Sequence, residues 1–183
     1  MIKPLYIICL FALLGLGLVS CKKEKSDSIE IMDISEYNSS EYIVNNSTFC
    51  FSAGTFSDFD YLSVDNNSVS DVKVGYQYSF QGGNAYSSYY IAKVNPGVLI
   101  EFAINSDSLL MPYLDGDNIG PSCIWYSKSY FSIPSEDLNI WFTGVKYIGF
   151  KIPDGNTYKY GFIKFYYDQT ISKGCFGPSV MQR

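Results

Sequence analysis

The clearest structural signal in the chain is Asp71-Val72-Lys73-Val74-Gly75-Tyr76-Gln77-Tyr78-Ser79-Phe80. Apolar or aromatic side chains at every second position alternate with polar residues and a glycine, which is the period of a strand with one buried face. The next residues, Gln81-Gly82-Gly83-Asn84, tolerate the positive φ angles of a tight turn. A second, Tyr-rich extended run follows from Tyr86 to Val94. The stretch therefore predicts an antiparallel β-hairpin.

Extended runs recur along the rest of the chain. The turn signal Asn95-Pro96-Gly97 precedes a largely apolar run, Val98 to Ile104, which predicts a central strand. Further strands are expected at Cys123–Phe131, Leu138–Phe142, Val145–Ile152 and Thr157–Tyr167. After Pro134, the residues Ser135-Glu136-Asp137-Leu138 could cap a single helical turn. Because the chain shows no long amphipathic helix, we expect an all-β fold, a single antiparallel β-sandwich of the jelly-roll or Ig-like kind.

The strongest turn signal is Pro153-Asp154-Gly155-Asn156. It joins Lys146–Ile152 to Tyr158–Phe165 in a predicted hairpin. This hairpin resembles a C-terminal element of secreted bacterial β-sandwich proteins of unknown function, in which Tyr-Ile-Gly-Phe, a polar turn and Tyr-Gly-Trp-Ile follow one another. Here Phe162 replaces the tryptophan. The resemblance implies an architecture and leaves the activity open.

The N-terminus has the parts of a secretory signal: Lys3, an apolar run from Leu5 to Val19, and the small residue Ser20. The run is shorter than the about 20 apolar residues that cross a membrane comfortably. Its end, Leu18-Val19-Ser20-Cys21, resembles the lipobox of bacterial lipoproteins. The resemblance implies cleavage between Ser20 and Cys21, a diacylglycerol on the Cys21 thiol, and an acyl chain such as palmitate on the new amino group. An ordinary cleaved signal or an uncleaved anchor helix are the alternatives.

Three segments are expected: a signal peptide at 1–20, the lipidated cysteine with a flexible tether at 21–40, and the β-sandwich domain at 41–183. The run Lys22–Ser28 is charged and has no aromatic residue, so it cannot bury enough apolar surface to fold. Several acyl chains on one cysteine would hold the protein in a membrane, most simply the outer membrane of a bacterial cell envelope. Lys23-Glu24 fits a surface-export signal that Lys25 interrupts, which leaves the periplasmic and the surface side both open.

Charge and composition exclude several functions. The chain has 13 basic and 18 acidic residues, a net charge of −5, and no basic stripe that would bind nucleic acid. It has no histidine, which removes the usual catalytic triads and His-ligated zinc or haem. A carboxylate hydrolase stays formally open, with Asp115 and Asp117, or Glu136 and Asp137, as its acids. Nothing distinguishes these from solvated loop residues, so we expect no enzyme and no cofactor beyond the lipid.

Removal of the signal peptide and lipidation of Cys21 leave three cysteines, Cys50, Cys123 and Cys175. A disulfide can persist in an envelope compartment. Cys123 and Cys175 both lie beside turn signals and are the candidate pair, whereas Cys50, flanked by two phenylalanines, is expected to be a small buried hydrophobe. Three unpaired thiols are the alternative, because spacing does not determine connectivity.

The densest acidic loop, Asp115-Gly116-Asp117-Asn118-Ile119-Gly120, resembles the start of an EF-hand calcium loop. Ile119 stands in place of the third ligand, and Tyr126 stands where the closing glutamate would be. Asp115, Asp117 and Asn118 are therefore candidates for a partial calcium loop, with a polar turn as the alternative. No other metal site is predicted.

Aromatic residues are abundant, with 17 Tyr, 13 Phe and 2 Trp. Exposed aromatic rings bind sugars or protein partners, but the same residues are favoured in strands and fill sandwich cores. The candidate ligand-binding aromatics are Tyr86, Tyr89, Tyr90, Trp125 and Tyr126. The leading hypothesis is a lipid-anchored envelope protein that presents a β-sandwich for glycan or protein binding or adhesion. A structural or assembly lipoprotein is the alternative, followed by the carboxylate hydrolase.

Overall fold

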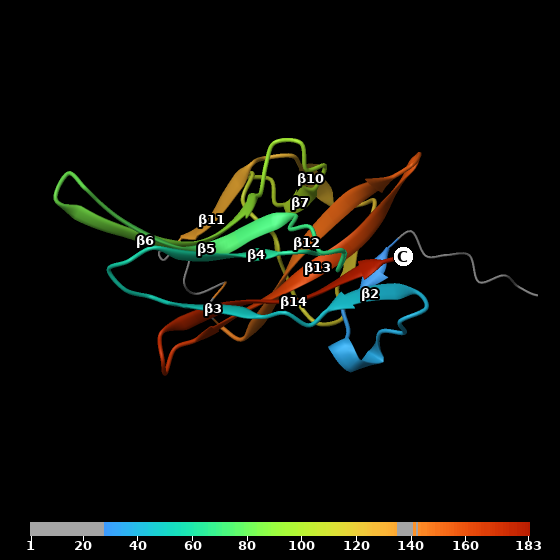
Figure 1. Cartoon of the computed structure of the whole chain (residues 1–183), viewed down its shortest axis with the longest axis horizontal. Helices are drawn as coiled ribbons and strands as arrows, with labels where there is room; N and C mark the ends of the chain where they lie inside the picture. The colour runs from blue at the N-terminus through green and yellow to red at the C-terminus, as the bar shows by residue number, and fades with distance from the viewer. Residues whose placement is uncertain (1–27, 135–140, 142) are drawn as a thin grey trace, which may run out of the picture.

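The computed structural model describes residues 28–134, 141 and 143–183, which form the all-β fold expected from the sequence (Figure 1). One of its two main sheets has four antiparallel strands in the order β11-β6-β5-β4. Its strands are β4 (Asp58–Leu62), β5 (Val72–Gln81), β6 (Asn84–Lys93) and β11 (Tyr130–Pro134).

The second main sheet has eight strands, with the central order β10-β7-β12-β13-β14-β2 and two short additions, β3 beside β14 and β8 beside β12. Its strands are β2 (Tyr42–Asn45), β3 (Phe49–Ser52), β7 (Glu101–Ile104), β8 (Pro112–Tyr113), β10 (Ile124–Tyr126), β12 (Val145–Asp154), β13 (Thr157–Asp168) and β14 (Lys173–Gln182). A small third sheet pairs β1 (Ile29–Glu30) with β9 (Asn118–Ile119), and a single 3-10 turn, η2, covers Ile34–Glu36.

The main core lies between the two large sheets. Val74 and Ile91 point inward from the four-stranded sheet and pack in one cluster with Phe150, Phe165 and Phe176 of the eight-stranded sheet. All five side chains are buried. Burying such side chains between two sheets is the main stabilising term of a sandwich, at about 1.5–3 kcal/mol each. The predicted β-sandwich is confirmed.

The other face of the eight-stranded sheet is also covered. Neighbouring residues of a strand point to opposite faces, so Phe162 enters a second core while Ile163 enters the first. Ile29 and Ile31, near the start of the described chain, pack in this second core and are buried. The expected tether at 21–40 is therefore too long, because its residues from Ile29 onward supply the apolar cover that this sheet face needs.

The two predicted hairpins are confirmed. β5 and β6 pair from Val72–Lys93 to Gln81–Asn84, and the turn between them places Gly82 and Gly83 at φ +59° and +87°. β12 and β13 pair from Val145–Tyr166 to Asp154–Thr157 around Gly155, at φ +62°. Residues with a Cβ adopt such angles at a cost, which explains the turn glycines.

Two strand predictions need correction, and one long strand was not predicted. The run Cys123–Phe131 does not form one strand: β10 joins the eight-stranded sheet and β11 the four-stranded one. The run Val98–Ile104 yields only the four-residue strand β7, and β14 was not expected, because its glycines and proline hide the strand pattern. The predicted strand Leu138–Phe142 and the predicted helical turn at Ser135 lie outside the described residues, apart from Trp141, which is buried against Phe165.

The disulfide joins Cys50 to Cys175, so the expected pair of Cys123 and Cys175 is wrong. The register of β3 and β14 places Cys50 directly opposite Cys175, and Cys123 is free. Cys50 is exposed at the surface rather than buried. This pairing follows from a strand contact between distant segments, which no local pattern discloses.

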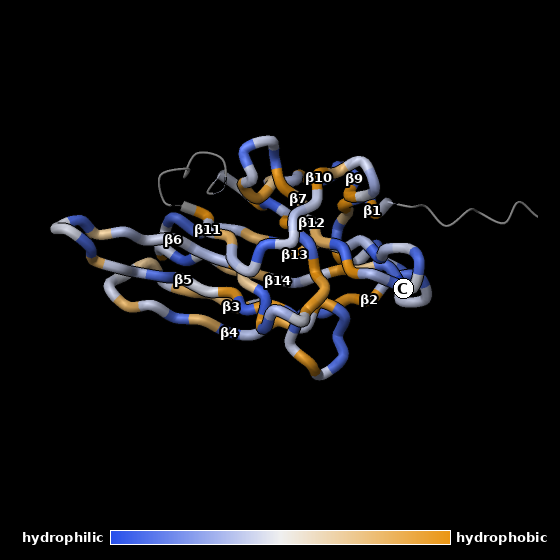
Figure 2. The backbone as a smooth tube through the Cα atoms, turned by 90° about the horizontal axis from the view of Figure 1, so that it is seen from above, coloured by the Kyte–Doolittle hydropathy of each residue, from blue (hydrophilic) through white to orange (hydrophobic). Residues whose placement is uncertain are grey.

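The two ends of the sandwich differ. β1 and the C-terminus lie at one end of the molecule, and the β5–β6 hairpin extends at the opposite end (Figures 1 and 2). The four-stranded sheet runs from the middle of the molecule to this second end. Its outer face is therefore far from the first described residues.

Candidate functional site: the outer face of the four-stranded sheet

The outward side of the four-stranded sheet carries a band of aromatic and polar side chains across all four strands. Strand alternation sends Val72, Val74 and Tyr76 of β5 into the core and leaves the intervening side chains on the outside. The cross-strand register places residues of β4, β6 and β11 beside them. This outer aromatic face consists of Phe59, Tyr61, Lys73, Gln77, Tyr86, Tyr90 and Tyr130.

Tyr90 and Tyr130 form a pair at the β11 end of the outer aromatic face. Their rings stack with centroids 5.3 Å apart and planes 25° apart. The Tyr130 hydroxyl donates to Oε1 of Gln77 at 3.0 Å, which fixes the ring orientation. Burial raises the pKa of Tyr90 to about 12, with Tyr130 and Tyr61 adding to the effect. The pair forms a rigid, mostly apolar base that keeps hydroxyl groups nearby.

Lys73 connects this base to the aromatic residues of β4. Its ammonium lies 3.6 Å from the centroid of the Phe59 ring and 5.9 Å from that of Tyr90. Such cation–π contacts contribute about 0.5–1 kcal/mol at exposed sites. Phe59 in turn meets Tyr61 edge to face at 5.6 Å. Phe59 and Tyr61 remain 47% and 46% exposed, so their rings are accessible to a ligand.

Gly75 allows β4 to approach this face closely. A Cβ at Gly75 would lie 2.4 Å from the carbonyl oxygen of Asp58 and 2.9 Å from Cβ of Phe59. Both distances are shorter than any ordinary contact. The absence of a side chain at Gly75 therefore lets Phe59 lean across β5 toward Lys73.

The free edge of β4 is capped by its own side chains. The backbone N–H of Phe59 donates to Oδ1 of Asp58, and that of Tyr61 donates to Oδ1 of Asp60, both at 2.8 Å. Edge strands with free N–H groups are templates for pairing with another chain. Two acidic side chains along β4 satisfy these donors and add negative charge to the edge.

The five aromatic residues expected to bind a ligand do not form one patch. Tyr86 and Tyr90 lie on the outer aromatic face, Tyr86 half-exposed and Tyr90 almost buried. Tyr89 points the other way, is 3% exposed and belongs to the core, so it is not a surface residue. Its hydroxyl accepts from the Gly174 N–H at 3.0 Å and donates to the Phe51 carbonyl at 3.2 Å.

Trp125 and Tyr126 lie on the eight-stranded sheet instead. Tyr126 is 47% exposed at the edge strand β10. Trp125 packs at 5.6 Å from Tyr160, and the Lys151 ammonium lies 5.3 Å from the Trp125 ring. The same ammonium lies 4.1 Å from the ring centroid of Tyr158. It also pairs with Glu101 at 3.1 Å. The chain's own lysine therefore occupies the space between these rings.

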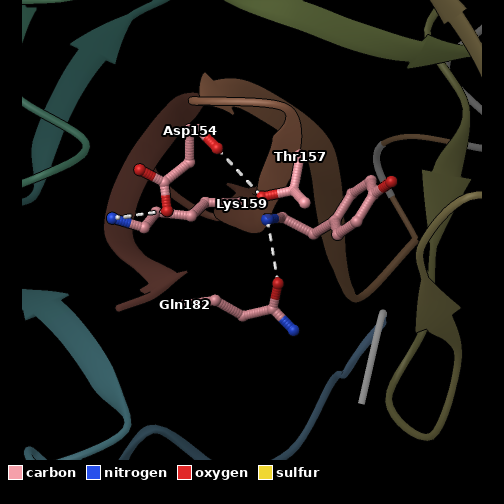
Figure 3. Close-up of polar contacts among 5 residues, drawn as sticks. Asp154, Thr157, Lys159 and Gln182 are labelled. Atoms are coloured by element: carbon pink, nitrogen blue, oxygen red, sulfur yellow. Dashed lines mark hydrogen bonds and ion pairs between the residues drawn. The ribbon is translucent and has the colours of Figure 1, made fainter. Parts of the chain in front are cut away.

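The polar contacts next to this cluster hold the strand ends together (Figure 3). Lys159 pairs with Asp154 at 3.2 Å, and the Thr157 hydroxyl donates to the Asp154 carbonyl at 2.9 Å, which closes the β12–β13 turn. Oε1 of Gln182 accepts from the backbone N–H of Tyr160 at 3.1 Å. Outside the residues drawn, Nε2 of Gln182 donates to the Ser28 carbonyl at 3.0 Å. These contacts tie the start of the described chain to the sandwich.

The loop that was the calcium candidate is hydrogen-bonded to the N-terminal segment of the domain. Oδ1 of Asp115 accepts from the Tyr147 hydroxyl at 2.6 Å, and Oδ2 of Asp117 accepts from the Leu114 N–H at 2.7 Å. The backbone N–H of Gly116 donates to Ile31 at 2.9 Å. In the described part of the chain, no three Cys, Asp or Glu side chains are grouped so that they could hold a metal ion. Asp115 and Asp117 lie in one short loop, and both carboxylates accept hydrogen bonds from the protein itself.

Sequence reasoning missed Phe59, Tyr61, Lys73, Gln77 and Tyr130. A signal for the first two was present, because Asp58-Phe59-Asp60-Tyr61 alternates acidic and aromatic residues with period two. That alternation places both rings on one side of a strand. Nothing local indicates that β11 joins β6 and brings Tyr130 onto Tyr90.

Several predicted residues cannot be placed. Ser20, Cys21 and the acidic pair Glu136 and Asp137 lie outside the described residues.

Within residues 28–134, 141 and 143–183, no helix is both long and apolar enough to cross a membrane. Comparison of the chain with protein-family models, curated proteins and solved structures found no match.

Proposed function

We propose that the protein is a lipid-anchored binding module of a bacterial cell envelope, and that the outer aromatic face engages its ligand. The observation that carries the proposal is a continuous band of aromatic rings and hydrogen-bonding groups across all four strands of one sheet. Half-exposed rings such as Phe59 and Tyr61 cost solvation free energy unless a partner covers them. The few residues that dominate binding energy in recognition surfaces are enriched in tyrosine and tryptophan.

The arrangement of the chain supports presentation of this face away from a membrane. Ser28 lies seven positions after Cys21, a length that spans at most about 25 Å when fully extended. Its backbone is held by Gln182 at the end of the molecule opposite the β5–β6 hairpin (Figure 1). A lipid on Cys21 would keep the Ser28 end near the bilayer. The face and the hairpin would then point into the surrounding space.

The anchor is tested by Cys21→Ala in the full precursor. The variant is expected to lose labelling by a fatty-acid probe and to stay uncleaved between Ser20 and position 21, with its β domain folded. Protease treatment of intact cells separates the surface side from the periplasmic side. Normal labelling and processing of the variant would contradict the proposed anchor.

The binding face is tested with a photoreactive amino acid in place of Tyr61 on intact cells. We expect a covalent adduct from this position and none from the same group at Asp107, an exposed residue between β7 and β8. Adducts of equal yield at both positions, or at neither, would contradict a binding role for this face.

A further inference from the structure

The capped edge of β4 limits what kind of ligand the outer aromatic face can bind. A peptide that binds by strand addition needs free backbone N–H groups on an edge strand. On β4 the N–H groups of Phe59 and Tyr61 are taken by Asp58 and Asp60. An extended peptide would have to displace both carboxylates before it could pair. A ligand that approaches the face from β4 is therefore held by side chains.

The charges on and beside this face are few and of both signs. Its cation, Lys73, lies against the Phe59 ring, and the carboxylates of Asp58 and Asp60 line the adjacent edge. The protein as a whole carries a net charge of −5. A polyanion would find a single lysine on the face and would be repelled by the neighbouring carboxylates and the negative net charge. A polycation would be repelled by Lys73 at the centre of the face. Charge complementarity therefore favours an uncharged ligand.

The remaining groups suit a molecule with both apolar and hydroxyl-bearing surfaces. The rings of Phe59 and Tyr61 offer apolar contact area, and the exposed Gln77 accepts from Tyr130 through its oxygen. Its amide nitrogen can donate to a ligand. From β4 to β11 the face measures about 14 Å, given three inter-strand spacings of about 4.8 Å. Sugar rings combine C–H faces that pack on aromatic rings with hydroxyl groups that donate and accept hydrogen bonds.

We infer that the ligand of the outer aromatic face is a neutral polysaccharide whose chain crosses the strands from Tyr61 to Tyr130. This inference rests on the proposed function and names its ligand class. Tyr61 and Tyr130 provide the two ends of the contact area, and Lys73 lies between them on β5, directly opposite Tyr61. Gln77 lies four residues further along β5, where its Oε1 accepts from the Tyr130 hydroxyl.

The test uses the mature lipoprotein in detergent and three neutral probes, a soluble glucan, a mannan and a galactan, with polygalacturonate as the anionic counterpart. Binding is measured by affinity electrophoresis and titration calorimetry. At least one neutral polymer is expected to bind, with an affinity that changes less than about twofold when salt is raised, because screening affects only charged contacts. Tyr61→Ala and Tyr130→Ala are each expected to weaken binding about tenfold.

Tyr158→Ala is the matched control, since Tyr158 is 44% exposed on the eight-stranded sheet, close to the 46% of Tyr61. It is expected to leave the affinity unchanged. The inference would be overturned if Tyr158→Ala lowered the affinity as much as the face variants do, or if neither Tyr61→Ala nor Tyr130→Ala changed the affinity. So would preferential, salt-sensitive binding of polygalacturonate.

The adduct trapped at position 61 separates this inference from the proposed function. An adduct made of neutral sugars supports the inference even when no probe in the panel binds. A protein adduct, or one made of acidic sugars, overturns the ligand class and leaves the binding role of the face intact. No adduct and no binding to any probe would reject both.

Discussion

The hydroxyl of Tyr89 on β6 accepts a hydrogen bond from the backbone N–H of Gly174 on β14, so one side chain joins the two sheets of the sandwich. The Tyr89 ring also fills the space above Gly174, where a Cβ would come within 2.4 Å of the ring. The same hydroxyl donates to the Phe51 carbonyl on β3. Tyr89 is thus a structural tyrosine in a strand whose next residue, Tyr90, belongs to the outer aromatic face.

Tyr89→Phe is expected to lower the free energy of unfolding by about 1–3 kcal/mol, because the buried N–H of Gly174 and carbonyl of Phe51 lose their partner. Urea unfolding followed by tyrosine and tryptophan fluorescence measures the change. Below the unfolding transition the variant should bind ligand like the wild type. A stability equal to wild type would show that these two hydrogen bonds contribute nothing.

Replacing Asp58 and Asp60 together by alanine is expected to cause self-association. The change frees the N–H groups of Phe59 and Tyr61 on an edge strand that also carries two half-exposed aromatic rings. Light scattering coupled to gel filtration over a range of concentrations would show dimers or larger species.

The control for this variant is Asp107→Ala combined with Glu36→Ala, which removes the same charge from two exposed positions away from the β4 edge. If the control associates to the same extent, the loss of net charge is responsible and not the edge. A monomeric Asp58→Ala, Asp60→Ala protein would contradict the capping role.

Removing the disulfide with Cys50→Ala and Cys175→Ala is expected to cost about 4–5 kcal/mol of unfolding free energy. The bond closes a loop of sequence separation 125, and longer loops confine the unfolded chain more. Denaturant unfolding with and without reductant gives the value. Cys123→Ala should change little, because Cys123 is the free cysteine, and a larger effect from it than from the pair would contradict the assigned connectivity.

The free energy of unfolding is expected to depend on pH through the carboxyl group of Asp71. Burial raises the pKa of its carboxyl above the usual 3.8, against the opposing hydrogen bond from the Val64 N–H. Because the pKa in the folded protein is the higher one, the stability that this group contributes is complete below pH of about 4 and is lost as the pH rises through the raised pKa.

Asp71→Asn keeps an oxygen for the Val64 N–H and removes the buried charge. The stability of the variant relative to wild type should therefore increase from acid to neutral pH and then level off. Unfolding curves at several pH values measure this difference, with Asp107→Asn as an exposed control. A difference that does not change with pH would contradict the raised pKa.

Local patterns predicted a large part of the fold. The alternation from Asp71 to Phe80 and the turn residues Gly82, Gly83 and Gly155 act over a few residues, so both long hairpins could be inferred directly. The β-sandwich class followed from the number of such strands. The run Cys123–Phe131 was misassigned because its two strands belong to different sheets, which depends on partners far away in the chain.

The candidate site was predictable only in part. The abundance of aromatic residues indicated a binding surface. However, aromatic residues occur on both faces of these strands, and the sequence does not show which face packs in the core. Tyr89 and Tyr90 are neighbours in the same strand, and only packing against β14 on one side and Tyr130 on the other decides which one enters the core and which one lies on the outer face. The same holds for Cys50, whose partner is set by the register of β3 and β14.

What the sequence determined by itself is therefore local: the period of two, the positions of the turns, the absence of histidine and the motif that predicts lipidation at Cys21. The tertiary structure decided which side of each strand is buried, which cysteines pair, and that Ile29 and Ile31 belong to the domain. The physical reason is that backbone conformation responds to neighbouring residues, whereas burial and strand register depend on surfaces brought together by the whole chain.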